Sequence, residues 1–343
     1  MPETVPADSF LYLAQSLPVI DVRSPGEYAE GHIPGAHNVP LFDNDERAEV
    51  GTLYKHQGRR PAILRGLEIA GGKLAWYVRE TLKISPDEDV LVHCWRGGMR
   101  SSSFAWFLES ADVKARVLEG GYKAYRHFIR SSFAAAKRIV ILSGMTGTGK
   151  TEILKRLAER GEQVVDLEGL ANHKGSAFGA IGQDEQPTTE QFENNTAALW
   201  LTLDVSRRIW IEDESLKIGR CVINDVLYGM MRQAPVIAID IPLARRIERL
   251  VNEYCIIPPE ALVSVVYRIQ RRLGDVRTKQ TIESLQSGDY RRAIEVLLDY
   301  YDRAYRHGRS RRDPATVTDY AFNDESTGQI ADDLIRRADR AGF

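Results

Sequence analysis

Short apolar runs alternate with helical patterns through the first third of the chain. The runs at residues 18–23 and 89–94 predict buried strands, whereas residues 62–82 and 101–110 have the periodicity of helices. Strands that alternate with helices indicate a parallel sheet with helices on both faces. Between the first strand and the first long helix, residues 43–60 are mostly polar, and we expect an excursion on the surface.

The alternation resumes after a predicted helix that runs from Tyr122 to about Ala136. We expect strands at residues 137–144, 162–169, 207–215 and 235–242, helices at about 150–160 and up to Trp200, and a largely helical, Arg-rich final third. The predicted fold class is therefore α/β, with two parallel-sheet domains, the second of which carries the helical C-terminal part. Topology alone places the domains at residues 1–135 and 136–343.

Composition limits the class of protein and its compartment. With 43% hydrophobic and 27% charged residues, the 343-residue chain is long enough for two soluble domains. No apolar run could span a bilayer, and we find no signal peptide. Three widely spaced cysteines, Cys94, Cys221 and Cys255, indicate a reducing compartment without a disulfide framework. We therefore expect a cytoplasmic protein with no membrane association, and the sequence indicates no stable protein partner.

The stretch DVLVHCWRGGMRSSS places Cys94 between a buried strand and a helix. The loop contains two glycines and two arginines, Arg96 and Arg100, so that backbone N–H groups, a helix N-terminus and two cations would stabilise a thiolate. The alternative is a buried structural cysteine, because cysteine is often buried. A core cysteine needs no basic, glycine-rich loop, so we interpret Cys94, Arg96 and Arg100 as catalytic residues.

The run IVILSGMTGTGKTEIL matches the phosphate-binding loop (P-loop) motif G-x-x-x-x-G-K-T between a predicted strand and a predicted helix. Its backbone N–H groups would surround a phosphate, while Lys150 neutralises charge and Thr151 reaches a magnesium ion. The predicted phosphate-binding residues are Gly144, Gly147, Thr148, Gly149, Lys150 and Thr151. A chance match in a turn is the alternative. Nothing marks an adenine site, so we expect no tightly bound cofactor, and nucleotide binding stays open.

Carboxylates end two of the strands near this motif: Asp166, Glu168, Glu212, Asp213 and Glu214. Each could hold magnesium or act as an acid or base, and each could equally be a solvated strand end. The sequence therefore does not specify a metal site. His173 and Lys174 in the loop ANHKG are further site candidates, with a capping or turn role as the alternative.

The N-terminal part resembles the rhodanese family. The stretch IDVRSPGEYAEGHIPGAHNVP is similar to that family's signature, and the matching residues are Asp21, Arg23, Glu27, His32, Ile33, Pro34, Gly35 and Ala36. The resemblance implies that Cys94 carries a persulfide or transfers sulfur. However, the loop reads Cys-x5-Arg, one residue longer than usual, which is the length found in related cysteine phosphatases and arsenate reductases. A plain sulfurtransferase is therefore not the expected function.

The chain as a whole, from about Pro18 to about Tyr301, resembles the tRNA 2-selenouridine synthases. The resemblance is carried by HCWRGGMRSSS, GMTGTGKT, DLEGLANHKGSAFG, IEDES and the segment from Ala234 to Pro242. It implies replacement of sulfur by selenium in wobble 2-thiouridine of tRNA, with selenophosphate as donor and an S-geranylated intermediate made from geranyl diphosphate. Cys94 would then handle selenium, Arg96 and Arg100 would hold the phosphate, and the P-loop would hold the diphosphate.

A basic region between Arg268 and Arg312 fits an RNA partner. It contains twelve Lys or Arg and six Asp or Glu, with tyrosines interspersed, and these residue types contact backbone phosphate and stack on unpaired bases. The predicted contacts to the anticodon region of tRNA are Arg271, Arg272, Arg311 and Arg312. The alternative is a solvated helical surface with ordinary ion pairs between helix neighbours.

Two other functions fit parts of the sequence. A cysteine phosphatase, arsenate reductase or sulfurtransferase fused to a nucleotide-binding module would explain the Cys-x5-Arg loop. A tRNA-binding switch without enzymatic activity would explain the P-loop and the basic region. Neither explains DLEGLANHKGSAFG together with IEDES, so we favour the synthase.

Overall fold

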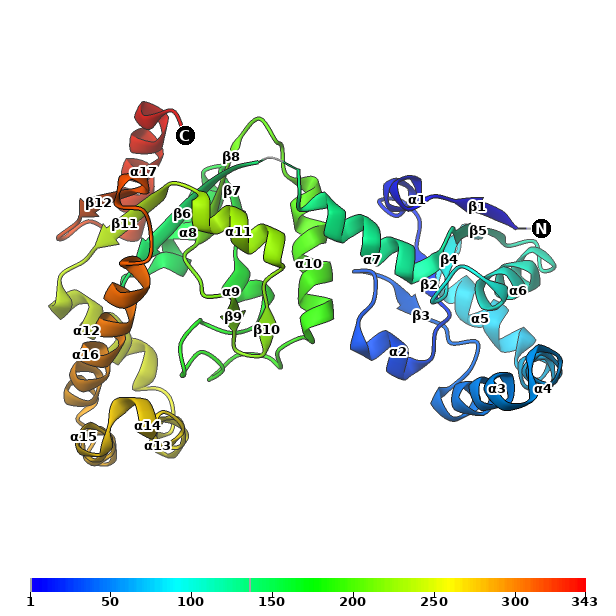
Figure 1. Cartoon of the computed structure of the whole chain (residues 1–343), viewed down its shortest axis with the longest axis horizontal. Coiled ribbons are helices and arrows are strands. Elements are labelled where there is room, and N and C mark those ends of the chain that lie inside the picture. The colour runs from blue at the N-terminus through cyan, green and yellow to red at the C-terminus, as the bar shows by residue number, and fades with distance from the viewer. Residues whose placement is uncertain (1, 136) are drawn as a thin grey trace. The chain divides into compact units, whose positions relative to one another are not determined.

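The computed structural model describes residues 2–135 and 137–343, and it separates into two compact units, Met1–Ser132 and Phe133–Phe343 (Figure 1). The division lies three residues before the boundary that topology suggested. The end of the predicted helix at Ala136 lies outside the described residues. Each unit has its own sheet and its own core.

The first unit is built on a five-stranded sheet in the order β1-β5-β4-β2-β3, with every pair parallel. The strands are β1 (Glu3–Val5), β2 (Val19–Asp21), β3 (His37–Asn38), β4 (Asp89–His93) and β5 (Lys114–Leu118). The helices are α1 (Ala7–Leu13), α2 (Pro25–Glu30), α3 (Asn44–Gln57), α4 (Arg59–Gly71), α5 (Leu74–Ile84), α6 (Met99–Glu109) and α7 (Gly121–Ser132). Fully buried residues of β2 and β4 pack against Tyr77 and Phe104. This confirms the predicted parallel-sheet class.

Residues 43–60 lie on the surface, as expected, but two details of this unit were not predicted. The polar stretch at residues 43–60 is helical: Asp43 caps α3 by accepting a hydrogen bond from the Glu46 N–H, and the Glu46 carboxylate accepts one from the Asp43 N–H. Residues 62–82 form two helices rather than one, because α4 ends at Gly71 and α5 begins at Leu74. Consecutive glycines at this point make a continuous helix unfavourable.

The second unit contains a parallel sheet in the order β12-β11-β6-β8-β7, beside a two-stranded β10-β9 hairpin. The strands are β6 (Arg138–Gly144), β7 (Gln163–Val165), β8 (Arg208–Glu212), β9 (Lys217–Ile218), β10 (Cys221–Val222), β11 (Val236–Asp240) and β12 (Val317–Ala321). All four predicted strands are present in the central parallel arrangement. The strand expected at residues 162–169 is shorter, because it ends at Val165 and Leu167–Leu170 form a helix, and the strand expected at residues 207–215 ends at Glu212. Strand β12 is an addition, since the final third was expected to be helical.

The helices of the second unit surround the sheet and extend beyond it (Figure 1). They are α8 (Lys150–Glu159), α9 (Leu167–Leu170), α10 (Thr189–Thr202), α11 (Asp225–Gln233), α12 (Leu243–Tyr254), α13 (Pro259–Arg268), α14 (Gln270–Leu273), α15 (Asp275–Gln286), α16 (Tyr290–Arg309) and α17 (Thr327–Ala341), with a 3-10 turn at Pro314–Thr316. Helices α13 to α16 enclose an apolar cluster of their own, separate from the cluster beside the sheet. The basic region is therefore a folded helical subdomain.

A close backbone contact shapes the carboxyl end of β4. The N–H groups of Tyr122 and Lys123 donate to the carbonyls of Cys94 and Trp95, at 2.8 and 3.0 Å. Gly121 has φ +60°, and a Cβ atom there would collide with the Cys94 carbonyl and the Gly97 nitrogen. The loop after β4 can take this path because residue 121 has no side chain.

Replacing Gly121 with alanine should therefore destabilise the first unit by roughly 2 kcal/mol or more, through backbone strain and steric collision. Gly35→Ala is the matched control, since φ is +81° but nothing lies within 4 Å of the added Cβ, and strain alone costs about 1 kcal/mol. Urea unfolding of both variants measures the difference. Equal losses would show that the contact with the Cys94 loop is unimportant.

Candidate functional site

Cys94 follows β4 directly and precedes α6, which begins at Met99. The side chain is 3% exposed, and its Sγ lies 3.1 Å from the Ser101 hydroxyl, which also lies 3.2 Å from the Gly98 carbonyl. A hydroxyl in the first turn of the helix can donate to a thiolate, and the helix N-terminus adds positive potential. The sulfur therefore lies buried at the N-terminal end of a helix with a hydroxyl beside it, and its catalytic role stays a prediction.

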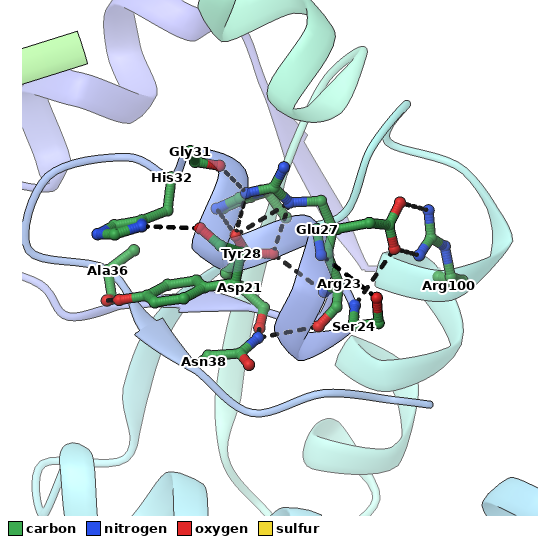
Figure 2. Close-up of polar contacts among 11 residues, drawn as sticks. Asp21, Arg23, Ser24, Glu27, Tyr28, Gly31, His32, Ala36, Asn38 and Arg100 are labelled. Carbon is green, nitrogen blue, oxygen red and sulfur yellow. Dashed lines mark hydrogen bonds and ion pairs between the residues drawn. The ribbon is translucent and has the colours of Figure 1, made fainter. Parts of the chain in front are cut away.

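Arg100 is held beside this sulfur by Glu27 (Figure 2), with guanidinium-to-carboxylate distances of 2.8 and 3.4 Å. Burial opposes ionisation of Glu27, but the hydrogen bond and charge of Arg100 lower its pKa overall. Glu27 in turn accepts from the Ser24 N–H in the capping box of α2. Glu27, which belongs to the rhodanese-like signature, thus fixes the side chain of Arg100 at the end of the Cys-x5-Arg loop. Arg96 of the same loop is exposed.

A buried ion pair supports the other side of the loop. Arg23 donates to Asp21 at 2.6 Å and to the Gly31 carbonyl at 2.7 Å (Figure 2), and its guanidinium lies 3.9 Å from the centre of the Tyr122 ring. Tyr122 is the residue whose N–H donates to the Cys94 carbonyl. Arg23 and Asp21 therefore support the loop from within the core. Neither contacts a ligand, because both are fully buried.

The P-loop connects β6 to α8, which begins at Lys150. Gly147 and Gly149 have φ values of +82° and +84°, and the Lys150 ammonium donates to the Gly144 carbonyl at 2.8 Å. The Thr148 hydroxyl donates to the Met145 carbonyl at 2.8 Å and lines a cavity of about 270 Å³. The strand, loop and helix that the motif requires are all present.

The five candidate carboxylates have different surroundings. The Thr151 hydroxyl donates to Glu168 at 3.0 Å, and Glu168 and Glu214 share a hydrogen bond. Burial and the Glu168 charge raise the pKa of Glu214 to about 8, and burial also raises the pKa of Glu168. One proton is therefore shared by this pair near neutral pH, opposite Lys150.

Glu212 is almost fully buried, and it accepts from the Glu168 N–H at 2.7 Å. Burial, followed by the charge of Asp166, raises its pKa well above the ordinary value. Asp166 itself caps α9 by accepting from the Gly169 N–H. Glu212 and Asp166 therefore fix the start of the short helix α9, which carries Glu168.

The ANHKG loop covers the carboxylate pair. The His173 N–H donates to the Glu168 carbonyl at 3.0 Å, and a Cβ at Gly175 would collide with the carboxylates of both Glu168 and Glu214. The His173 ring is buried, which lowers its pKa. Lys174 is exposed and forms an ion pair with Glu253. The loop thus joins the site through its backbone and His173 rather than through Lys174.

The structure gives Arg312 a different role from the predicted tRNA contact. Its side chain is 2% exposed and forms an ion pair with Asp213, whose other oxygen accepts from the Ser143 hydroxyl at 2.6 Å. Arg312 therefore fixes the end of β8 from inside the domain, and a phosphate cannot reach it. Arg271, Arg272 and Arg311 are exposed.

Family models match both units of the chain. A rhodanese-like domain matches residues 8–127, and the tRNA 2-selenouridine synthase AAA domain matches residues 137–327. The tRNA 2-selenouridine synthase of Shewanella frigidimarina is 38% identical over 74% of this chain and 70% of its own length. That of Hahella chejuensis is 36% identical, with 90% and 92% covered, and that of Bdellovibrio bacteriovorus is 34% identical, with 84% and 87% covered.

This chain belongs to the tRNA 2-selenouridine synthase family. The match extends through both units, so the family accounts for the cysteine loop and the P-loop together. Within the part of the chain that the structure describes, no helix is long and apolar enough to cross a membrane.

Two further arginines of this synthase-family chain contact the P-loop, and the sequence analysis missed them. Arg246 donates to the Thr146 carbonyl at 2.8 Å and to Asp302 of α16 at 3.0 Å. Arg249 lies against Gly149 and is 3.5 Å from Glu152. Both belong to α12, whose sequence LARRIERLVNEY has the pattern of an ordinary amphipathic surface helix, so no sequence signal distinguishes them.

The Glu168–Glu214 pair should make stability depend on pH. A carboxyl whose pKa is higher in the folded than in the unfolded chain favours folding at low pH, and this contribution is lost as pH rises from about 4.5 to about 8. Between pH 5 and pH 8.5, the free energy of unfolding should fall by about 1–2 kcal/mol less in Glu214→Gln than in the unsubstituted chain, as measured by urea unfolding. The exposed Glu260→Gln is the control, and identical profiles for both variants would contradict the assignment.

Proposed function

We propose that this chain replaces sulfur by selenium in wobble 2-thiouridine of tRNA, with selenophosphate as selenium donor, through an S-geranylated intermediate made from geranyl diphosphate. The observation that carries the proposal is that one chain contains two different strand-to-helix loops suited to anions. One runs from the thiol of Cys94 to Arg100, and the other contains Lys150. The names of the relatives support tRNA as the substrate and selenouridine as the product.

The P-loop domain would perform the first step, geranyl transfer. The sulfur of 2-thiouridine attacks the carbon that bears the diphosphate, the carbon–oxygen bond breaks, and diphosphate leaves. Lys150 and the loop N–H groups would stabilise the charge that develops on the leaving group, and Arg249 lies close enough to assist. S-Alkylation also releases the proton on N3 of the base, and the ionised member of the Glu168–Glu214 pair is a candidate acceptor because burial raises the pKa of both carboxyls.

The rhodanese-like domain would perform the second step, selenium incorporation. The selenium of selenophosphate attacks C2 of the base, the carbon–sulfur bond breaks, and geranylthiol leaves with a proton; alkylation makes the sulfur a better leaving group. Water then cleaves the selenium–phosphorus bond, which releases phosphate and leaves selenium on C2. Arg100 and Arg96 would bind the phosphate of selenophosphate. Cys94 would position selenophosphate for this attack. A selenopersulfide on Cys94 would require a two-electron oxidant that selenophosphate does not supply.

Magnesium at the P-loop is part of the proposal. The oxygen donors next to the loop are the Thr151 hydroxyl and the Glu168 carboxylate, which suit a hard cation. Among the described residues, no three His, Cys, Asp or Glu side chains form a metal-binding group, so a magnesium ion would depend on diphosphate oxygens for further ligands. Bound there, it would supply charge neutralisation of the diphosphate.

The two steps should be separable by substitution. Cys94→Ala should abolish selenouridine formation but preserve S-geranylation, whereas Lys150→Ala should weaken geranyl diphosphate binding about tenfold to a hundredfold and stop geranylation. The measurements are mass spectrometry of tRNA nucleosides and calorimetry with geranyl diphosphate. Normal selenouridine with Cys94→Ala, or unchanged diphosphate affinity with Lys150→Ala, would show that the role is assigned to the wrong loop.

The exposed arginines of α14 should contribute to tRNA binding. Among the described residues, no salt-bridge partner is found for Arg271 or Arg272. Their replacement by alanine together should weaken binding of modified and unmodified tRNA alike and should reduce the slope of log affinity against log salt by about one unit per contact. Fluorescence titrations at several salt concentrations measure the slope. Cys94→Ser is the control, and a slope equal to that control would leave these arginines as a solvated surface.

A further inference from the structure

The first unit contains a cavity to which the proposed function has not yet assigned a role. A cavity of about 920 Å³ lies among α3, α4 and α6, in the size range of small-molecule sites. Its lining is mainly apolar and includes Phe42, Val50, Ala62, Ile63, Leu67 and Phe107. The cavity is large enough for a branched hydrocarbon chain of ten carbons.

The apolar surface continues to the mouth of this cavity. Tyr54 is 62% exposed, Leu67 is 55% exposed and Met99 is 49% exposed, and all three line the cavity. Contiguous apolar side chains that remain in water normally mark a binding site. Packing within the unit therefore does not explain the exposed apolar side chains of α4, and they indicate a ligand.

The mouth also carries positive charge and reaches the cysteine loop. Arg47, Lys55, Arg59 and Arg100 line the cavity together with the apolar residues. Met99 and Arg100 belong to the Cys-x5-Arg loop, and the Arg59 guanidinium lies 3.8 Å from the Met99 sulfur. A molecule in the cavity can thus place its hydrocarbon part between α3 and α4 and its polar part beside Met99 and Arg100 of the cysteine loop.

We propose that this cavity holds the geranyl chain of the S-geranylated wobble base while selenium attacks C2 at the Cys94 loop. The inference rests on the proposed function and adds the site of the leaving group. An apolar chain joined to a polyanion matches an apolar cavity with a cationic rim: the chain enters the cavity, and phosphates that flank the base lie near Arg47 and Arg59. When the carbon–sulfur bond breaks, geranylthiol remains in the cavity and the base is released from it.

The test uses two matched substitutions on α4. Leu67→Asp places a charge inside the cavity, and Leu64→Asp places the same charge on the same helix outside it. Both leucines are exposed, at 55% and 57%, so neither change should unfold the domain. Binding is measured with anticodon stem-loop RNAs that contain either S-geranyl- or S-methyl-2-thiouridine, and conversion of the first RNA to selenouridine is measured with selenophosphate.

The wild-type chain and Leu64→Asp should bind the S-geranyl RNA more tightly than the S-methyl RNA, since each buried methylene changes affinity about fourfold. Leu67→Asp should reduce this preference roughly tenfold or more and slow conversion accordingly, without weakening binding of the S-methyl RNA. Equal behaviour of the two variants would overturn the inference. So would a Leu67→Asp variant that fails only in making S-geranyl RNA from geranyl diphosphate, or one that only changes the oligomeric state.

The proposed function fails in a distinguishable way. If S-geranyl RNA is not an intermediate, the wild-type chain itself will not convert it to selenouridine, whatever residue stands at position 67. Failure of the inference alone leaves wild-type conversion intact and removes only the difference between Leu67→Asp and Leu64→Asp.

Discussion

Both candidate sites depend on one constraint. A parallel strand leads directly into a helix through a short loop, and the backbone N–H groups of that loop must remain accessible to a ligand. After β4 this passage is possible because Gly121 lets the neighbouring turn approach the Cys94 carbonyl. After β6 it is possible because Gly147 and Gly149 adopt positive φ values. Helix N-termini then add positive potential at the same points, so each loop is suited to an anion before any side chain is considered.

Side chains give the two loops different chemistry. At Cys94, an ionised Glu27 holds Arg100 beside a thiol, which suits a tetrahedral oxyanion bound near a nucleophile. At the P-loop, Lys150 faces the proton-sharing pair Glu168 and Glu214, which suits departure of a charged group together with proton transfer. The proposed geranyl transfer and selenium incorporation would use these properties in that order, because the second step would need the leaving group that the first step makes.

The sequence predicted the parts of the fold that local patterns determine, namely the central strands and the two strand–loop–helix motifs. It did not predict α3, because this helix is polar throughout and its start depends on the Asp43–Glu46 capping box. It also did not predict β12, which is a largely exposed edge strand. The prediction for Arg312 was wrong because an arginine in a basic run looks the same in sequence whether it faces solvent or is buried in an ion pair with an aspartate. Arg246 and the cavity beside α4 depend on tertiary packing between distant segments, which no local pattern contains.

In the proposed reaction selenium enters only after the sulfur has been alkylated, and a stepwise reconstitution tests this order most directly. The purified chain is incubated with 2-thiouridine tRNA and either geranyl diphosphate, selenophosphate or both, and the nucleosides are followed by mass spectrometry over time. We expect S-geranyl-2-thiouridine with geranyl diphosphate alone, its conversion to 2-selenouridine when selenophosphate is added, and no product with selenophosphate alone. Selenouridine that forms at an undiminished rate without geranyl diphosphate would contradict it.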